Sequence, residues 1–454
     1  MPSSCQAIQA GKGGINSGFV SRPVSRSAIL TFMANEYAVA VQPLGVREVN
    51  TGAVLELLKR RRQTTRTELI RLSGLSKATV SVIVADLLER GLAQAAGRQQ
   101  EGRGRSRVVL EFNPMARSVL GAQIADDVCV VVLTDLDGRP YQSTTRRLRG
   151  TAPEIVMDAL IDGISELRHA AASAVLGLGV GTPGVVDRAG RHIRMAVSHG
   201  WRNVAVADLL EERLGLPVVV ANRAKVAALG QLRRDQDDGP TDLIYVFLGK
   251  GVIAGLVIDG QLYFGRDGWA GDIGHLTVQP DGVLCGCGNR GCLYTVAGEQ
   301  AILALARSHA RHAGPSTVLH TLTEGRLAEL TLPLLAEAAH RADGAALATL
   351  DEVGTCLGIV IANLVNVLNP DVVVLGGPST CLGEPLVDVI RREMHRRALT
   401  EATHKLDVTI SQAGDESGAT GAAILWISRA LAVSTPLRLL GDHRPQARHV
   451  ERVR

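Results

Sequence analysis

The chain has 454 residues, 46% hydrophobic and 21% charged, which is enough for two or three domains with substantial cores. Of its seven cysteines, three lie within eight residues and the rest are scattered, which excludes a secreted disulfide framework. No apolar run reaches transmembrane length, so we expect a cytoplasmic protein with no membrane partner. Residues 1–112 carry 16 Lys and Arg against 8 Asp and Glu, whereas the remainder carries 33 against 37. The basic first part indicates a polyanionic partner, although a solvated basic face would give the same count.

The first 112 residues divide into two parts. Residues 1–46 are rich in Ser, Gly and Ala without periodicity, which predicts a disordered extension. A helical pattern begins at Val49, and Thr65 and Glu68 form a capping box for a second helix. A third helix is predicted from Ser76 to Arg90, with apolar residues at helical spacing.

A hairpin is predicted to follow these helices. The segments 92–96 and 108–112 are strand candidates, and the Gly- and Arg-rich stretch 97–107 lies between them. Two helices joined by a tight turn that contains glycine form a helix-turn-helix. Residues 47–112 are therefore predicted to be a winged helix-turn-helix that binds DNA; a three-helix protein-interaction module is the alternative.

From residue 113 to 430 the pattern changes to alternating strands and helices, which indicates an α/β architecture. Strands are expected at 128–133, 175–180, 218–221, 243–248, 255–258 and 372–375. Helices are expected at 153–174, 297–312, 332–340, 345–368 and 385–397. Residues 431–454 form a charged tail.

Three cysteines and one histidine have the spacing of a structural metal site. His275, Cys285, Cys287 and Cys292 supply one imidazole and three thiolates, and glycines alternate with the cysteines. This set predicts one structural zinc ion per chain. A redox cluster or incidental buried thiols would be the alternative.

The segment Arg66–Leu92 resembles the winged helix-turn-helix at the front of regulators of the ROK family (repressors, open reading frames, kinases). The resemblance implies a double-stranded DNA operator as partner, with the second helix in the major groove. The residues expected to contact bases or phosphates are Arg66, Lys77, Thr79, Ser81, Arg98, Arg103, Arg105 and Arg107.

Residues 119–425 resemble the kinase-like ROK domain. The resemblance covers the loop Gly179–Asp187, the run Val220–Gly230, the cysteine motif and the segment Asn369–Gly377. It implies two α/β lobes of the actin-like type with a ligand cleft between them. The full expectation is an α/β protein, a winged helix-turn-helix followed by a two-lobed sugar-kinase-like domain.

Several positions depart from the ROK kinase pattern. The family's phosphate loop Asp-x-Gly-Gly-Thr is Gln123–Asp127 here, and its Gly-Thr-Gly is Gly249–Gly251 with Lys250 in the middle. Arg223 stands where the kinases have the aspartate that accepts the proton of the sugar hydroxyl. Arginine stays protonated and accepts no hydrogen bond, so we expect no catalytic residue and no enzyme activity.

The resemblance also implies a small, sugar-like effector in the cleft. The candidate ligand-binding residues are Gly181, Pro183, Asn222, Arg223, Lys225, Lys250, Asp272 and Tyr294. Arg223, Lys225 and Lys250 add positive charge, which favours an anionic sugar derivative. Alternatively, these cations pair with Asp126, Asp127 or Asp272 and only hold the lobes together.

Together these features predict a sequence-specific DNA-binding regulator, a repressor of carbohydrate-related genes, assembled as a homodimer or homotetramer. The first alternative is a ROK sugar kinase with an accessory DNA-binding domain, against which Arg223 argues. The second is an interaction scaffold without a DNA role, against which the arginines of the wing argue.

Overall fold

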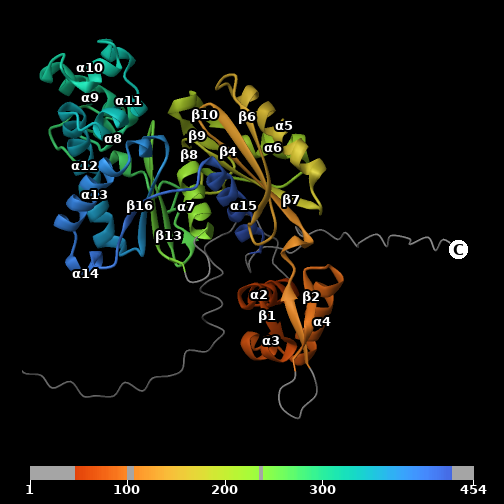
Figure 1. Cartoon of the computed structure of the whole chain (residues 1–454). Helices are drawn as coiled ribbons and strands as arrows, with labels where there is room; N and C mark the ends of the chain where they lie inside the picture. The colour runs from red at the N-terminus through yellow and green to blue at the C-terminus, as the bar shows by residue number, and fades with distance from the viewer. Residues whose placement is uncertain (1–45, 100–106, 235–238, 432–454) are drawn as a thin grey trace, which may run out of the picture. The chain divides into compact units, whose positions relative to one another are not determined.

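The computed structural model describes residues 46–99, 107–234 and 239–431 (Figure 1). The predicted extension up to residue 45 and the tail from residue 432 lie outside the described residues. So does the tip of the predicted wing, residues 100–106, with Arg103 and Arg105. All structural statements below concern the described parts of the chain.

The first described part has three helices and a three-stranded antiparallel sheet of order β1-β3-β2. Its elements are α2 (Val46–Arg61), β1 (Gln63–Thr65), α3 (Arg66–Ser73), α4 (Lys77–Glu89), β2 (Ala93–Gln99) and β3 (Arg107–Phe112). Val54, Leu58, Leu69, Val80 and Leu110 lie in its core with 0 to 1% of their surface exposed. The predicted helices and hairpin are present, and β1 was not predicted.

Side chains cap both short helices of this part. Thr65 accepts a hydrogen bond from the backbone N–H of Glu68 at 3.3 Å, and Ser76 accepts one from Thr79 at 3.1 Å. Each cap satisfies one of the amide groups left free at a helix start. In a full capping box the Glu68 carboxylate would accept from the backbone N–H of Thr65. Here it accepts from the Thr64 hydroxyl at 3.1 Å instead.

The second part begins with a five-stranded sheet of order β11-β7-β4-β5-β6, which we call lobe 1. Its elements are β4 (Ser118–Ile124), β5 (Val128–Thr134), β6 (Pro140–Arg147), α5 (Pro153–Ala170), β7 (Val175–Thr182), β8 (Val185–Val186), β9 (Ile193–Ala196), β10 (Trp201–Val204), α6 (Val206–Leu214) and β11 (Val218–Asn222). Strands β4, β7 and β11 are parallel, and α5 and α6 pack on the same hydrophobic cluster as the sheet.

A second five-stranded sheet, of order β14-β13-β12-β15-β16, forms lobe 2. Its elements are β12 (Leu243–Leu248), β13 (Val252–Ile258), β14 (Gln261–Leu262), α8 (Tyr294–Ala297), α9 (Glu299–Ala313), α10 (Val318–Leu322), α11 (Leu332–His340), α12 (Gly344–Leu368), β15 (Val372–Gly376), α13 (Glu384–Arg397), α14 (Thr400–Thr403) and β16 (Val408–Ile410). The helix predicted from Ala297 begins at Glu299, because Gly298 is extended and ends α8.

Two helices, α7 (Arg223–Arg234) and α15 (Asp415–Leu431), lie between the two sheets (Figure 1). Helix α15 packs on β4 and β7 of lobe 1, and α7 packs on β12 and β13 of lobe 2. Glycines allow the two helices to approach closely, because a Cβ at Gly421 would collide with the Val226 carbonyl oxygen. Helix α7 starts directly at the cleft residue Arg223, so its placement decides the geometry of the cleft.

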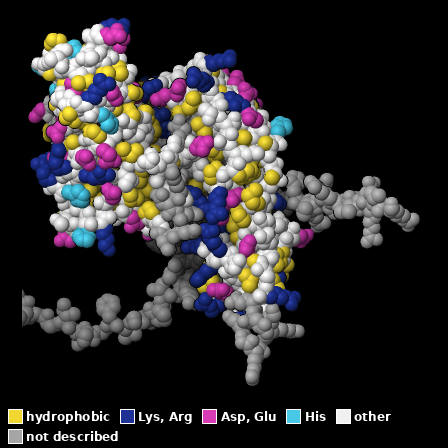
Figure 2. All heavy atoms as spheres, viewed as in Figure 1, with side chains coloured by type: hydrophobic (Ala, Val, Ile, Leu, Met, Phe, Trp, Pro, Cys, Tyr) yellow, Lys and Arg dark blue, Asp and Glu magenta, His cyan; other side chains and the backbone are white. Residues whose placement is uncertain are grey.

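One described helix, α12, is long and apolar enough to span a membrane, but 67% of its most apolar stretch is buried. It packs against α9 and α13 in the largest hydrophobic cluster of lobe 2. It is therefore a core helix of that lobe. On the face seen in Figure 2, acidic and basic side chains are interspersed over lobe 2 rather than gathered by sign.

Candidate functional site

Helix α4 presents the residues predicted to face DNA. Lys77 and Ser81 are exposed, whereas Val80, Ile83, Val84 and Leu87 are buried. Thr79 is half-buried, and its hydroxyl lies 2.8 Å from the Ser76 hydroxyl, so it takes part in the helix cap. Arg66, Arg98 and Arg107 are exposed. From Lys77 to Ala85, the exposed residues of α4 thus combine one cation, one hydroxyl and apolar groups, and Glu89 adds a carboxylate at the end of the helix.

The four predicted metal ligands converge. One ligand atom from each of His275, Cys285, Cys287 and Cys292 lies within 4.8 Å of all the others. The Cys285 thiol is 3.7 Å from the His275 Nδ1, and the Cys287 thiol is 3.7 Å from the Cys292 thiol. Tetrahedral ligands at zinc–sulfur distances are separated by about 3.8 Å, so this donor set fits a four-coordinate soft metal ion.

The chain wraps around this cluster in a tight loop. The Cys285 N–H donates to the Asn289 carbonyl at 2.7 Å, and Gly288 and Gly291 have φ angles of +96° and +63°. A Cβ at Gly291 would also collide with the Gln279 carbonyl oxygen. Glycine is required at Gly291 both for the backbone conformation and for this close approach.

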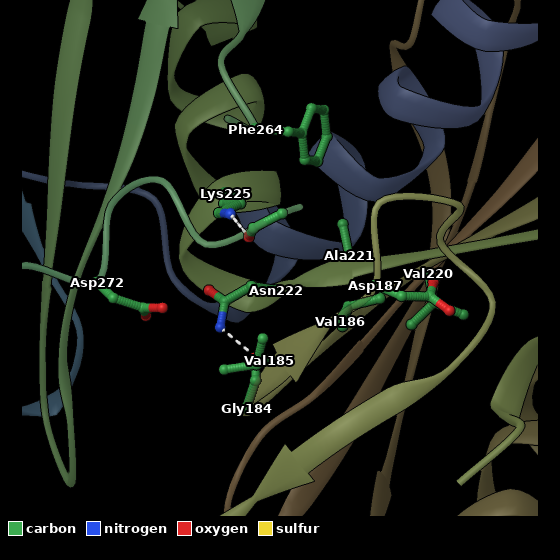
Figure 3. A pocket seen from close by; sticks show the side chains of 11 residues that line it. Gly184, Val185, Val186, Asp187, Val220, Ala221, Asn222, Lys225, Phe264 and Asp272 are labelled. Carbon is green, nitrogen blue, oxygen red and sulfur yellow. Dashed lines mark hydrogen bonds between the residues drawn. The ribbon is translucent and has the colours of Figure 1, made fainter. Parts of the chain in front are cut away.

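A small cavity lies between the lobes at the start of α7 (Figure 3). Its polar lining comes from Asp187 of lobe 1, from Asn222 and Lys225 at the start of α7, and from Asp272 of lobe 2. The enclosed volume is about 10 Å³, which is room for about one water molecule. This cavity by itself has too little room for a sugar.

Figure 3 shows how the polar groups of the cavity are held. The Asn222 amide donates to the Gly184 carbonyl at 2.7 Å and accepts from the Ala224 N–H at 2.8 Å, which caps α7. The Lys225 ammonium donates to the Gly268 carbonyl. Burial lowers the pKa of Lys225 and raises the pKa of Asp272, and each group opposes the shift of the other.

Asp272 differs from the other cavity residues. Its carboxylate is half-buried, and no hydrogen-bond donor from the described residues reaches it. A carboxylate in this position can accept hydrogen bonds from hydroxyl groups of a ligand. Asp272 is therefore the group of the cavity that is best placed to bind a polyol.

Asp126 lies between two of the predicted ligand-binding cations. Its carboxylate lies 3.4 Å from the Arg223 guanidinium and 3.6 Å from the Lys250 ammonium. Arg223 is 8% exposed and also lies over the Phe247 ring at 4.4 Å. Both cations thus share one carboxylate, Arg223 from a buried position and Lys250 from an exposed one, and Asp126 of lobe 1 joins Lys250 of lobe 2.

His199 lies beside this ion cluster and was not singled out from the sequence. Only 6% of its surface is exposed, and its Nε2 has no hydrogen-bond partner among the described residues. Burial lowers the pKa of His199; Asp126 opposes the shift, and Arg223 and Lys250 add to it. Burial and the two cations thus favour the neutral imidazole over the charged one.

The structure separates the predicted ligand residues into two groups. Asn222, Lys225 and Asp272 line the cavity, whereas Arg223 and Lys250 belong to the ion cluster. Gly181, Pro183 and Tyr294 do not line the cavity; Gly181 and Pro183 are buried, and the Tyr294 ring is 6.4 Å from that of His275. Sequence reasoning missed Asp187 and Phe264. Asp187 ends a loop that was recognised, but nothing in the sequence marks Phe264.

Comparison with known proteins identifies two families along the chain. Residues 120–429 match the ROK family, and residues 49–97 match the IclR helix-turn-helix domain. The ROK match covers more than half of the chain. It contains the cavity, the ion cluster and the cysteine loop, and the second match contains α3 and α4.

Relatives along nearly the whole chain are named as repressors. A xylose repressor from Bacillus subtilis (strain 168) is 28% identical over 394 residues, which are 86% of this chain and 98% of that protein. A glucokinase from Halalkalibacterium halodurans is 35% identical over 267 residues, but these are only 59% of this chain and 80% of the glucokinase. The similarity to kinases therefore does not extend over the full chain.

A solved structure shows the same arrangement. The crystal structure of a ROK family transcriptional regulator, described as a homologue of the E. coli MLC protein, covers 87% of this chain with a TM-score of 0.74 and 26% identity. The matched region makes up 99% of that regulator's own chain. The match thus includes a DNA-binding part as well as the two lobes. The chain belongs to the ROK family, and it is a DNA-binding transcriptional regulator.

Proposed function

We propose that the chain is a repressor of carbohydrate-related genes whose affinity for its operator is set by a sugar-like effector between the lobes. The observation that carries the proposal is the inter-lobe cavity with its unpartnered Asp272 carboxylate. Because the cavity holds about one water molecule, a sugar can enter only after the lobes move apart. Effector binding would then favour the open state over the closed one.

We infer that the effector is an uncharged sugar rather than an anionic one. Asp187 and Asp272 contribute two carboxylates to the cavity, and Lys225 contributes one ammonium that already donates to Gly268. Arg223 and Lys250 share Asp126, so an anion would have to replace that carboxylate. The alternative set out from the sequence, in which the cations pair internally, agrees better with these contacts.

Calorimetric titration of the intact protein with D-xylose, D-glucose and glucose 6-phosphate tests this proposal. A neutral sugar should bind, and Asp272→Asn should weaken its binding at least about tenfold, because a charged hydrogen bond is lost. Asp281→Asn, at an exposed position of the cysteine loop, is the control and should bind as the parent does. Stronger binding of glucose 6-phosphate than of either sugar would restore the anionic effector.

We further propose that residues 47–112 form the DNA-binding domain and residues 113–430 the effector domain of a cytoplasmic homodimer or homotetramer. Two recognition helices related by a twofold axis would bind a palindromic operator. Arg66, Lys77 and Ser81 support this assignment by their exposure, as do Arg98 and Arg107. Analytical ultracentrifugation of the protein with and without operator DNA tests it, and a monomer in both cases would contradict it.

We also propose that the four-residue cluster holds a structural zinc ion. His275, Cys285, Cys287 and Cys292 would hold the ion, which would tie the cysteine loop to lobe 2. Metal analysis should find one zinc per chain, and Cys287→Ser should lower both the zinc content and the melting temperature. Cys381→Ser, at an exposed cysteine outside the cluster, is the control. Metal-free protein with the parent's stability would refute the site.

A further inference from the structure

An apolar line runs along the exposed face of α4. Ala78, Val82 and Ala85 are all exposed and are spaced four and three residues apart, so they lie on one side of the helix. Val82 is the large member of this line, with 55% of its surface exposed. Lys77 and Ser81 flank the line.

Folding does not explain a valine at this position. The opposite side of α4 supplies the core residues Val80, Ile83, Val84 and Leu87, which are 0 to 3% exposed. An exposed valine costs helix stability relative to alanine, because its branched side chain loses freedom in a helix. The same stiffness makes Val82 a preorganised contact group, since little further entropy is lost on binding.

Charge along α4 indicates which end of the helix approaches DNA. Its first turn contains Lys77 and no acidic residue, whereas Asp86 and Glu89 stand toward its end. Asp86 pairs with Arg90 at 3.1 Å. The beginning of the helix can therefore enter a groove between phosphates. Val82 is the sixth residue of the helix and lies in its second turn, close to this end.

The major groove of DNA presents one apolar group, the C5-methyl of thymine. We propose that Val82 contacts this methyl group, so that each half of the operator contains a thymine that the protein selects through its methyl. This inference rests on the DNA-binding function and adds the base that the apolar line recognises. Lys77 and Ser81 would bind neighbouring acceptor groups of the bases or phosphates.

Deoxyuridine tests the proposal because it pairs like thymine but lacks the methyl group. Operator sequences are first selected from a random duplex library with the intact protein, and each thymine is then replaced singly by deoxyuridine. At one position per half-site, the replacement should weaken binding by about three- to fivefold, the value of one buried methyl. The same replacement should leave the affinity of the Val82→Ala variant for the operator unchanged.

Two further variants complete the experiment. Val82→Thr keeps the branched side chain but replaces one of its two methyl groups by a hydroxyl, so it should retain part of the deoxyuridine effect. Val46→Ala is the control: it shortens a valine on α2 that is 78% exposed, and it should retain the full deoxyuridine effect. An equal deoxyuridine effect in the parent and in Val82→Ala would overturn the methyl contact. Loss of self-association in Val82→Ala with an unchanged deoxyuridine effect would also overturn it and assign the line to a protein partner. A library without any enriched sequence would overturn specific DNA binding itself.

Discussion

At the scale of single residues, Arg223, which the family resemblance places at the catalytic position of the kinases, belongs to an ion cluster. Arg223 and Lys250 share the Asp126 carboxylate, but their burial differs, with 9% and 47% of the side-chain surface exposed. The difference predicts unequal contributions to stability, since solvent weakens an exposed ion pair.

The prediction is that Arg223→Gln lowers the free energy of unfolding by about 2 kcal/mol, because a buried pair and the contact with Phe247 are lost. The matched change Lys250→Gln should cost less than about 1 kcal/mol. Urea denaturation of both variants measures the two values. A cost for Lys250→Gln that equals or exceeds that for Arg223→Gln would show that burial does not govern this cluster.

His199 makes stability depend on pH. Because burial lowers its pKa in the folded state, protonation favours the unfolded chain. The contribution of the neutral imidazole is therefore full above the unfolded pKa of about 6.5 and is lost as the pH falls through the folded pKa. The free energy of unfolding of the parent should decrease more than that of His199→Gln between pH 7.5 and 5.5. Parallel pH profiles would exclude His199 as the cause.

At the scale of elements, the contact of α7 with α15 holds the cleft in place. Gly421→Ala would drive a methyl group into the Val226 carbonyl, so the helices would have to separate. We expect a loss of about 1 to 3 kcal/mol, as for other overpacked cores. Gly344→Ala at the start of α12, where a Cβ meets open space, should be neutral or stabilising. Equal melting temperatures for both variants would contradict a tight contact of α7 with α15.

The elements also show what the sequence could predict. The helix at 332–340 and the strand at 243–248 have the predicted bounds, because each is an apolar segment with clear ends. Strand β1 was missed because three residues carry no periodicity. Helix α7 was recognised only as a family segment. Its residues are buried from Arg223 to Gln231, including the polar Arg223, Lys225 and Gln231, so the polar positions of its sequence do not mark a solvent-exposed face.

At the scale of the whole molecule, the sequence predicted the kind of site better than its geometry. The metal ligands are close together in the chain, and their convergence followed from spacing alone. The cavity joins Asp187, Asn222, Phe264 and Asp272 from three separate segments, and no local pattern could assign Phe264 to it. Whether Arg223 and Lys250 faced a ligand or Asp126 also depended on how the lobes meet.

Quantitative footprinting of the intact protein on the DNA upstream of its own and neighbouring genes tests the central claim most directly. We expect a protected, near-palindromic site. We also expect that the neutral sugar identified by calorimetry changes the affinity of the protein for this site at least about fivefold, which is a coupling typical of allosteric proteins. The Asp272→Asn variant should protect the same site, but the sugar should not change its affinity for that site. No protected site, or protection that the bound sugar leaves unchanged, would contradict the account.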